Sequence, residues 1–400
     1  MHQNYLKEDK VNYMKIVFIQ GGSRWKLDQD GNIYTDANLN ETIWERYRNL
    51  CDELVVILRQ DSTIYSKNEA VNSFNLFDTN KNSYCILPDL YSPTKNYFSY
   101  KLRKETKMLI DEQIKSADKV IVREPGNYYT NYAVKASKKY NKEYLVEVTS
   151  CIFDVLWNHG LKGKVLAYFT DYKVKKIIRN SPYALYVTKE ALQKRYPTDG
   201  KSLGCSDVDV SNRNYKQRKK KSKIQIGTAA FLDVDWKAQK DVIRALALLR
   251  KQGIECFEYH LVGNGTGNSL LEEAKKQNVK DLVVIDGSLP HEQMKLWYEK
   301  IDLYVQPSYQ EGLCRSIVEA MASGCAVVCS DVGGNYELID RKFIYPPKDI
   351  DNLARLLVEM TKNDNLELQS KINYEKAKEY EKEYLDSIRN DFFNLFAHSE

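Results

Sequence analysis

The sequence contains no uninterrupted apolar run of about 18 residues, the length that a membrane-spanning helix requires. Its first residues also lack the basic segment followed by an apolar stretch that marks a secretory signal. These absences predict a cytoplasmic protein without a transmembrane helix. Residues 1–13 precede the first apolar strand and are expected to be a loose extension.

Cysteine is present, but its spacing does not suggest a disulfide framework or a zinc site. The eight cysteines form no CxxC pair and have no histidine at zinc-ligand spacing. Several of them follow apolar residues, as Cys329 follows the run 326–328. We therefore expect reduced, buried thiols of a cytoplasmic protein and no metal site.

Over the whole chain, neither positive nor negative residues are in large excess, but the two signs are unevenly distributed. Residues 1–205 contain 32 lysines and arginines against 24 acids, whereas the rest contains 28 against 31. The basic first half is compatible with peripheral contact to an anionic inner membrane, and equally with a solvated lysine-rich surface. No basic helix or aromatic-interleaved patch accompanies the charge, so nucleic acid is not an expected partner.

The chain is too long for one ordinary core, and short apolar runs alternate with longer helical patterns in both halves. This alternation predicts an α/β fold with two doubly wound parallel-sheet domains in series, facing a central cleft. The expected strands are 15–20, 53–58, 119–124, 143–148 and 183–188, then 224–229, 257–263, 282–286, 301–307, 326–330 and 342–346.

A polar stretch at about 200–222, ending in a run of basic residues, suggests the linker between the domains. The resulting boundaries are 1–205 for an acceptor-side domain and 206–373 for a nucleotide-sugar-binding domain. The tail 374–400 contains an amphipathic pattern over 374–396, which predicts a single helix that crosses back to the first domain.

Residues 301–338 hold the most informative motif of the sequence. A strand is followed by Glu311 and Gly312, and then by a helical pattern that contains Glu319 and ends at Gly324. If Glu311 stood at the helix entrance, Glu319 would lie roughly 12 Å along the axis. This separation suits two acceptors that hold opposite ends of a long polyhydroxyl ligand, and the helix N-terminus suits phosphates.

The surrounding residues sharpen this interpretation. The motif PS-x-x-EG, then EAMA-x-G, then a glycine pair before Glu337 and Leu338, is similar to that of glycosyltransferase family 4, the group 1 glycosyltransferases. Three further segments also resemble the family: Val262–Gly265, Val284–Gly287 and residues 236–240. The likeness is dense in the second half of the chain. Residues 46–47 and 187–197 resemble its capsule and exopolysaccharide branch more loosely.

The resemblance implies a GT-B fold, a nucleotide-diphosphate sugar as donor, with UDP expected, and no other cofactor. It implies that Glu311 contacts the transferred sugar, that Glu319 holds the ribose, and that Lys237 neutralises the leaving diphosphate. The remaining donor contacts are implied to be the backbone of Gly312, Leu313, Cys314, Gly287 and Ser288, with Gly21 and Gly22 after the first strand giving the first domain a close approach.

Two positions depart from the family pattern. The family often carries a basic residue near the first strand of its second domain, whereas Gly227–Ala230 has none, so Lys237 is expected to act without an arginine partner. The family also often places a histidine after a central strand of the first domain. The nearest candidate here is His159, as an acceptor-side catalytic group or as a structural histidine.

Three weaker patterns in the sequence carry little information about function. The two Asp-Val-Asp triplets, at 207–209 and 233–235, match a metal-binding pattern of the other glycosyltransferase fold, but this many are expected at random. The glycines at 263–267 lack a full dinucleotide-binding pattern. His260 lies within an expected strand and is interpreted as a structural histidine.

The resulting hypothesis is a retaining, metal-independent hexosyl- or N-acetylhexosaminyltransferase of surface-polysaccharide assembly. Its acceptor is expected to be a saccharide, in particular a polyprenyl-diphosphate-linked one at the inner membrane face. Two alternatives remain open: a GT-B sugar-nucleotide epimerase or phosphorylase, and a non-catalytic subunit of a polysaccharide-assembly complex.

Overall fold

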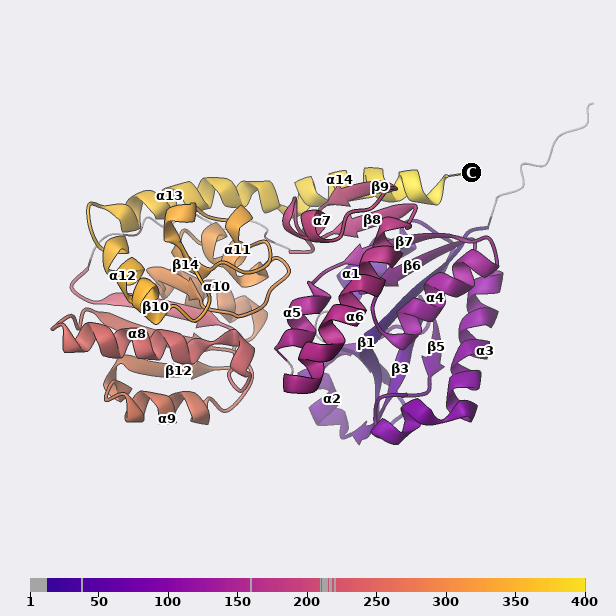
Figure 1. Ribbon diagram of the computed structural model, residues 1–400, viewed down its shortest axis with the longest axis horizontal. Helices are drawn as coiled ribbons and strands as arrows, with labels where there is room; N and C mark the ends of the chain where they lie inside the picture. Colours follow the sequence, from indigo (N-terminus) through magenta and orange to yellow (C-terminus); the bar gives the residue numbers. More distant parts are fainter. Residues whose placement is uncertain are drawn as a thin grey trace, which may run out of the picture.

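The computed structural model describes residues 13–36, 39–158, 160–208, 210, 215, 218 and 221–399. These form two lobes that lie side by side, and the C-terminal helices α13 (Asn365–Ala377) and α14 (Lys382–Ala397) run in succession along the second lobe and over the first (Figure 1). We call the sheet β1–β9 with its helices the first lobe, and the sheet β10–β15 with its helices the second lobe. The prediction of two parallel-sheet domains is confirmed.

The first lobe is built on a nine-stranded sheet. Its long strand β1 pairs in parallel with β3 on one side and with β6 on the other, and β7, β8 and β9 continue the parallel set. Strands β2 and β4 join in antiparallel fashion beside the far end of β1. The strands are β1 (Lys15–Asp28), β2 (Ile33–Thr35), β3 (Glu53–Tyr65), β4 (Asn75–Leu76), β5 (Ser83–Leu87), β6 (Lys119–Arg123), β7 (Glu143–Val148), β8 (Tyr183–Tyr186) and β9 (Lys201–Gly204).

Helices of the first lobe connect and cover these strands. Most of them begin at a residue that accepts a backbone hydrogen bond with its side chain, such as Asn40 before α1, Ser99 before α3 and Asn127 before α4. They are α1 (Glu41–Arg48), α2 (Lys67–Ser73), α3 (Tyr100–Ser116), α4 (Tyr128–Lys139), α5 (Ile152–Trp157), α6 (Gly160–Arg179) and α7 (Ala191–Arg195), with the 3₁₀ turn η1 (Thr94–Phe98).

The second lobe has a six-stranded, fully parallel sheet in the order β12-β11-β10-β13-β14-β15. Because both faces of such a sheet are covered, its strands β13 and β14 are buried at every residue. Its strands are β10 (Ile224–Ala229), β11 (Phe257–Val262), β12 (Val283–Gly287), β13 (Leu303–Gln306), β14 (Ala326–Ser330) and β15 (Ile344–Tyr345).

Helix α8 of the second lobe presents one apolar face. Its buried Val242, Ile243, Ala245, Leu246 and Leu249 follow the helical period. The helices are α8 (Gln239–Lys251), α9 (Asn268–Lys276), α10 (His291–Lys300), α11 (Arg315–Ala322), α12 (Ile350–Met360) and α13 (Asn365–Ala377), and the 3₁₀ turns are η2 (Asp235–Lys237), η3 (Lys280–Leu282), η4 (Asn335–Glu337), η5 (Arg341–Phe343) and η6 (Lys378–Tyr380).

The tail differs from its prediction as a single helix. Helix α13 ends at Ala377, η6 follows, and α14 (Lys382–Ala397) begins only after Glu381 has taken an extended conformation. Glu381 forms a β-bridge with Val210, so tertiary pairing breaks the helical pattern. Among the described residues, no helix combines the length and the apolar character needed to cross a bilayer.

Helix α14 packs on the first lobe rather than on the second. Phe396 lies edge-on to Tyr183, and Phe393 packs against Tyr47, with ring centroids 5.3 and 5.9 Å apart. Arg389 is buried and donates to the backbone carbonyl of Ser206. We propose that residues 1–205, 206–373 and 374–400 act as the two domains and the crossing segment.

Candidate active site

A pocket of about 240 Å³ lies where the two lobes face each other. Its walls come from segments that directly follow parallel strands, β6, β7 and β8 in the first lobe and β10 and β13 in the second. Ligands of open parallel sheets bind at these carboxyl ends. The lining residues are Arg123, Glu124, Thr149, Ser150, Cys151, Val155, Val187 and Asp207, then Trp236, Lys237, Gln310, Glu311, Gly312, Leu313 and Arg315.

Lys237 and Glu311 meet in this pocket. Lys237 ends η2, Glu311 lies in the loop after β13, and Lys237 Nζ stands 2.7 Å from Glu311 Oε1. Gln306 donates to the same oxygen at 3.2 Å. Burial by itself lowers the pKa of Lys237, but the adjacent Glu311 carboxylate outweighs it, and the pKa lies above the usual value. The ammonium is therefore charged, oriented and turned to the pocket.

Arg315 provides a second cation that the sequence analysis did not single out. It is the first residue of α11, its side chain is exposed, and it lines the same pocket. Burial alone would raise the pKa of Asp207, yet the charges of Arg315 and Arg123 hold it below the usual value. The absence of a basic residue in Gly227–Ala230 thus does not leave Lys237 as the only cation of the pocket.

Helix α11 begins later than expected. Its first residue is Arg315 and its N-cap is Cys314, so Glu311 lies in the preceding loop rather than at the helix entrance. The estimate of about 12 Å along one helix axis therefore does not apply to Glu311 and Glu319. Glu319 lies on the helix, outside the lining of the pocket, and accepts a hydrogen bond from Tyr298 at 3.0 Å.

Gly312 lies where the backbones of the two lobes approach each other closely. A Cβ atom on Gly312 would lie well inside 3.0 Å of the Thr149 backbone oxygen, which belongs to the first lobe. Within the second lobe, the Gly334 amide donates to the Gly312 carbonyl at 2.7 Å. Gly333 adopts φ +53° beneath the same loop. The glycine pair of the motif thus supports the loop of Glu311 and Gly312.

The lobes also bind each other beside the pocket. The Glu337 carboxylate of the second lobe accepts backbone N–H bonds from Lys189, Glu190 and Ala191, at 2.7, 3.0 and 2.6 Å. Asn158 donates to Gln310 at 2.9 Å. These contacts join the two lobes beside the site.

The other predicted site residues are more scattered. Leu313 lines the pocket, whereas Cys314 is buried outside its lining. Gly287 ends β12 with φ +76°, and Ser288 hydrogen-bonds Asn264. His159 lies outside the described residues.

Gly21 and Gly22 lie within β1, not after it, because the strand continues to Asp28 past a register shift in its pairing with β3. A Cβ on Gly21 would meet the side chain of Asn127, and Gly22 lines a second, neighbouring pocket.

Three first-lobe residues of the pocket were missed by the sequence analysis. Arg123 bridges Glu147 and Asp207, at 2.8 and 2.9 Å. Glu124 follows it with φ +56°, a backbone conformation that non-glycine residues rarely adopt and that is often found at functional sites. Thr149 Oγ1 donates to Glu124 at 2.5 Å. Their position at or directly after the carboxyl ends of β6 and β7 was the available signal.

The Asp-Val-Asp triplets have local structural roles where they are described. Asp207 pairs with Arg123, and Asp233 accepts backbone N–H bonds from Thr266 and Gly267. Asp209 lies outside the described residues. His260 lies between Asp286 and Glu258, and its hydrogen bond to Asp286 raises its pKa.

We predict that Arg315→Ala lowers kcat/KM by about tenfold, or ~1.4 kcal/mol, because the diphosphate that the sequence resemblance implies would lose one charge-assisted contact. Arg355→Ala, an exposed arginine on α12, is the matched control and should leave kcat/KM unchanged. Steady-state kinetics with the two variants would make the comparison. A loss below twofold for Arg315→Ala would contradict its role at the site.

Comparison with known proteins agrees with this geometry. Residues 212–379 match the family Glycosyl transferases group 1. Protein CapJ of Staphylococcus aureus is 32% identical over 347 residues, covering 86% of this chain and 85% of CapJ. The amylovoran biosynthesis glycosyltransferase AmsK of Erwinia amylovora is 31% identical over 132 residues, covering 30% of this chain and 32% of AmsK.

Solved structures share the whole two-lobed fold. HepE of Anabaena, solved with UDP and glucose, superposes with a TM-score of 0.62 at 14% identity, covering 95% of this chain and 99% of HepE. Sucrose-phosphate synthase of Thermosynechococcus elongatus gives 0.64 at 15% identity, covering 96% and 100%. The predicted GT-B fold is confirmed, and the chain belongs to the group 1 glycosyltransferases.

Proposed function

We propose that this glycosyltransferase moves a hexose or N-acetylhexosamine from a UDP-sugar to a saccharide acceptor in surface-polysaccharide assembly, with retention of configuration and without a metal ion. The observation that carries the proposal is the Lys237–Glu311 pair beside Arg315 in the pocket between the lobes. Two cations there suit a leaving diphosphate, and a paired carboxylate suits sugar hydroxyls.

The pocket residues would act mainly on the leaving group of the reaction. As the bond from the anomeric carbon to the diphosphate oxygen breaks, negative charge grows on that oxygen. Lys237 and Arg315 would stabilise this charge, with Lys237 already held in place by Glu311. The cations supply the charge that a metal ion provides elsewhere, which supports metal-independent transfer.

For transfer with retention, the state of the pocket carboxylates favours front-face attack over a covalent intermediate. Glu311 pairs with Lys237, and Asp207 pairs with Arg123. Glu124 accepts hydrogen bonds from Gln20 and Thr149. Each acid is thus engaged, which argues against one of them as a covalent nucleophile. The acceptor oxygen would form its bond on the face that the diphosphate leaves, and its proton would pass to the departing phosphate oxygen.

The place in polysaccharide assembly rests on the relatives. AmsK is named as an amylovoran biosynthesis glycosyltransferase, and the match to CapJ covers 86% of this chain. We propose a polyprenyl-diphosphate-linked saccharide as acceptor, at the cytoplasmic face of an anionic membrane. An epimerase would act on the donor alone, and a non-catalytic subunit would not hydrolyse donor, so product analysis without acceptor separates both alternatives.

Nucleotide binding, measured by thermal unfolding in EDTA, would test the donor site. At about 100 times its Kd, UDP adds about 2.7 kcal/mol of stability. For a lobe of about 200 residues this raises Tm by roughly 5–10 °C. Glu319→Ala should raise the Kd of UDP about tenfold, because the contact to the ribose hydroxyls is lost.

Glu272→Ala, an exposed glutamate on α9, is the control and should bind UDP normally. If UDP stabilised Glu319→Ala as well as the control, the ribose would be held elsewhere. If no nucleoside diphosphate, guanosine diphosphate included, stabilised the native chain, the proposed function would be wrong.

A further inference from the structure

Helix α6 of the first lobe exposes a continuous apolar stripe. Leu161, Val165, Tyr168 and Tyr172 are 82, 63, 63 and 71% exposed, and Phe169 beside them is 67% exposed. The first four are spaced by four, three and four residues, which places them on one face of the helix. An ordinary surface helix exposes a polar side, so an exposed apolar face of this size is unusual.

The opposite side of α6 attaches it to the lobe through a narrow stripe. Gly163, Ala167, Asp171, Val174 and Ile178 are the buried residues of the helix, again at helical spacing. Figure 1 shows α5 and α6 together at the front of the first lobe. Tyr168 packs edge-on against Phe153 and Trp157 of α5, whereas Leu161, Val165 and Tyr172 remain mostly exposed. The apolar stripe therefore points largely away from the protein body.

Basic residues border this stripe. Lys162 and Lys173 lie on one side of it on the helical projection, Lys164 lies on the other, and Lys176 and Arg179 follow its end. All five are exposed. The one acid of the helix, Asp171, faces inward and pairs with Lys175 and Arg195. The outer face of α6 thus combines apolar side chains with a purely positive border.

We propose that this face of α6 docks the enzyme on an anionic lipid bilayer. Helices that lie in a membrane interface bury an apolar stripe between the acyl chains and place lysines on either side, where they reach the headgroups. A protein partner would require polar and acidic side chains matched to it as well, whereas the border of this stripe has one charge only. The first half of the chain also carries a basic excess of eight residues, which favours the same surface.

The position of α6 relative to the pocket between the lobes supports this assignment. A second, mostly apolar pocket of about 370 Å³ is lined by Leu166, Thr170 and Val174 of α6. It shares Glu124 and Thr149, among others, with the candidate active site. This assignment rests on the proposed function. The pocket gives the lipid portion of a membrane-bound acceptor a place between the bilayer and the donor.

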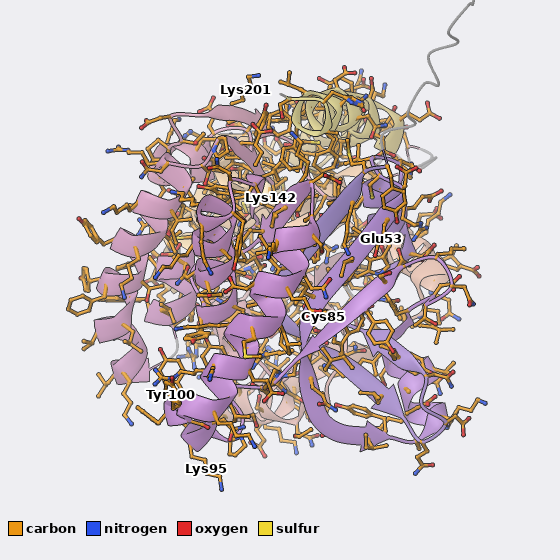
Figure 2. All side chains as sticks on the ribbon, turned by 90° about the vertical axis from the view of Figure 1, so that its right-hand side faces the viewer. Glu53, Cys85, Lys95, Tyr100, Lys142 and Lys201 are labelled. Atoms are coloured by element: carbon orange, nitrogen blue, oxygen red, sulfur yellow. The ribbon has the colours of Figure 1, made fainter. Side chains whose placement is uncertain are left out.

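Further exposed aromatic residues lie beyond the other wall of that pocket. Tyr91 lines it and stacks on Tyr97, with ring centroids 5.9 Å apart. Phe98 and Tyr100 follow, 76 and 74% exposed. Lys95 and Tyr100 stand at the lower edge of the lobe in Figure 2. Aromatic and lysine side chains on both sides of the pocket would anchor its mouth at the membrane interface.

Co-sedimentation of the full chain with lipid vesicles, without donor or acceptor, tests the proposal. The chain should bind vesicles of phosphatidylglycerol and phosphatidylcholine, bind pure phosphatidylcholine at least tenfold more weakly, and dissociate in high salt. Lys162→Gln with Lys173→Gln should weaken partitioning on anionic vesicles about 25-fold, since each lysine near such a surface contributes about fivefold.

A second variant addresses the apolar stripe. Leu161→Ser with Val165→Ser and Phe169→Ser should weaken binding by more than 100-fold, because three large side chains no longer enter the interface. These residues are exposed, so Tm should change little. Lys275→Gln with Lys276→Gln, two exposed lysines on α9 of the second lobe, is the matched control and should bind like the native chain.

Three outcomes would overturn the assignment. In the first, the native chain does not bind anionic vesicles. In the second, the α9 control loses binding as much as the α6 variants do. In the third, light scattering shows that the serine variant changes from dimer to monomer, which would make the stripe a self-association surface. UDP binding and donor hydrolysis in the absence of lipid are measured separately. Their failure would remove the proposed function without affecting the vesicle result.

Discussion

Lys237→Ala should lower kcat by two to three orders of magnitude, the largest effect expected of any single substitution in this chain. Loss of one preorganised donor to a developing oxyanion typically costs about 2.7–4 kcal/mol. Lys237 is mostly buried, charged and held 2.7 Å from Glu311, so it needs little reorganisation to meet the leaving diphosphate. Its removal also leaves the Glu311 carboxylate without its cation, next to the phosphates.

A double variant separates these two contributions. If Lys237 served only to neutralise Glu311, then Glu311→Gln in the Lys237→Ala background should restore most of the activity. We expect it to restore less than tenfold, because the diphosphate would still lack its cation. Lys240→Ala is the control, since Lys240 pairs with the exposed Asp235 and does not line the pocket between the lobes. Turnover of Lys237→Ala within threefold of the native value would remove the assignment.

Gly312→Ala should lower kcat/KM by about 100-fold while leaving the fold of each lobe intact. The added methyl group would overlap the Thr149 backbone oxygen, and a backbone atom cannot move aside as a flexible side chain would. Because Thr149 belongs to the other lobe, the overlap is relieved by keeping the lobes apart. A displacement of about 1 Å between reacting groups is enough for a 100-fold loss.

Binding and turnover together make this prediction specific. UDP should still stabilise Gly312→Ala, because its expected contacts lie in the second lobe. Gly253→Ala is a useful control, since its methyl group enters open space at φ +77°. It should cost about 1–2 kcal/mol of stability through its left-handed backbone and leave turnover unchanged. If Gly312→Ala lost UDP binding and melted early instead, Gly312 would serve the local fold rather than closure of the lobes.

Much of the second lobe was predictable from local patterns. Strands β10 and β14 have the predicted bounds. Both are short segments buried along most of their length, and a short window of sequence records such apolar runs. In the first lobe, β5 was missed within residues 60–100 because it is a short edge strand with half-exposed side chains.

The sequence by itself determined the two parallel sheets, the membership of the family and the selection of Lys237 and Glu311, because these depend on periodicity and on motifs within one lobe. Only the tertiary structure decided that Arg123, Glu124 and Arg315 face the same pocket, that Glu319 lies outside its lining, and that Gly312 meets the Thr149 carbonyl. It also decided that the tail breaks at Glu381 and that α6 leaves an apolar stripe exposed. The reason is physical: these features depend on contacts between segments far apart in the chain, and a residue's neighbours across an interface leave no regular period in its own segment.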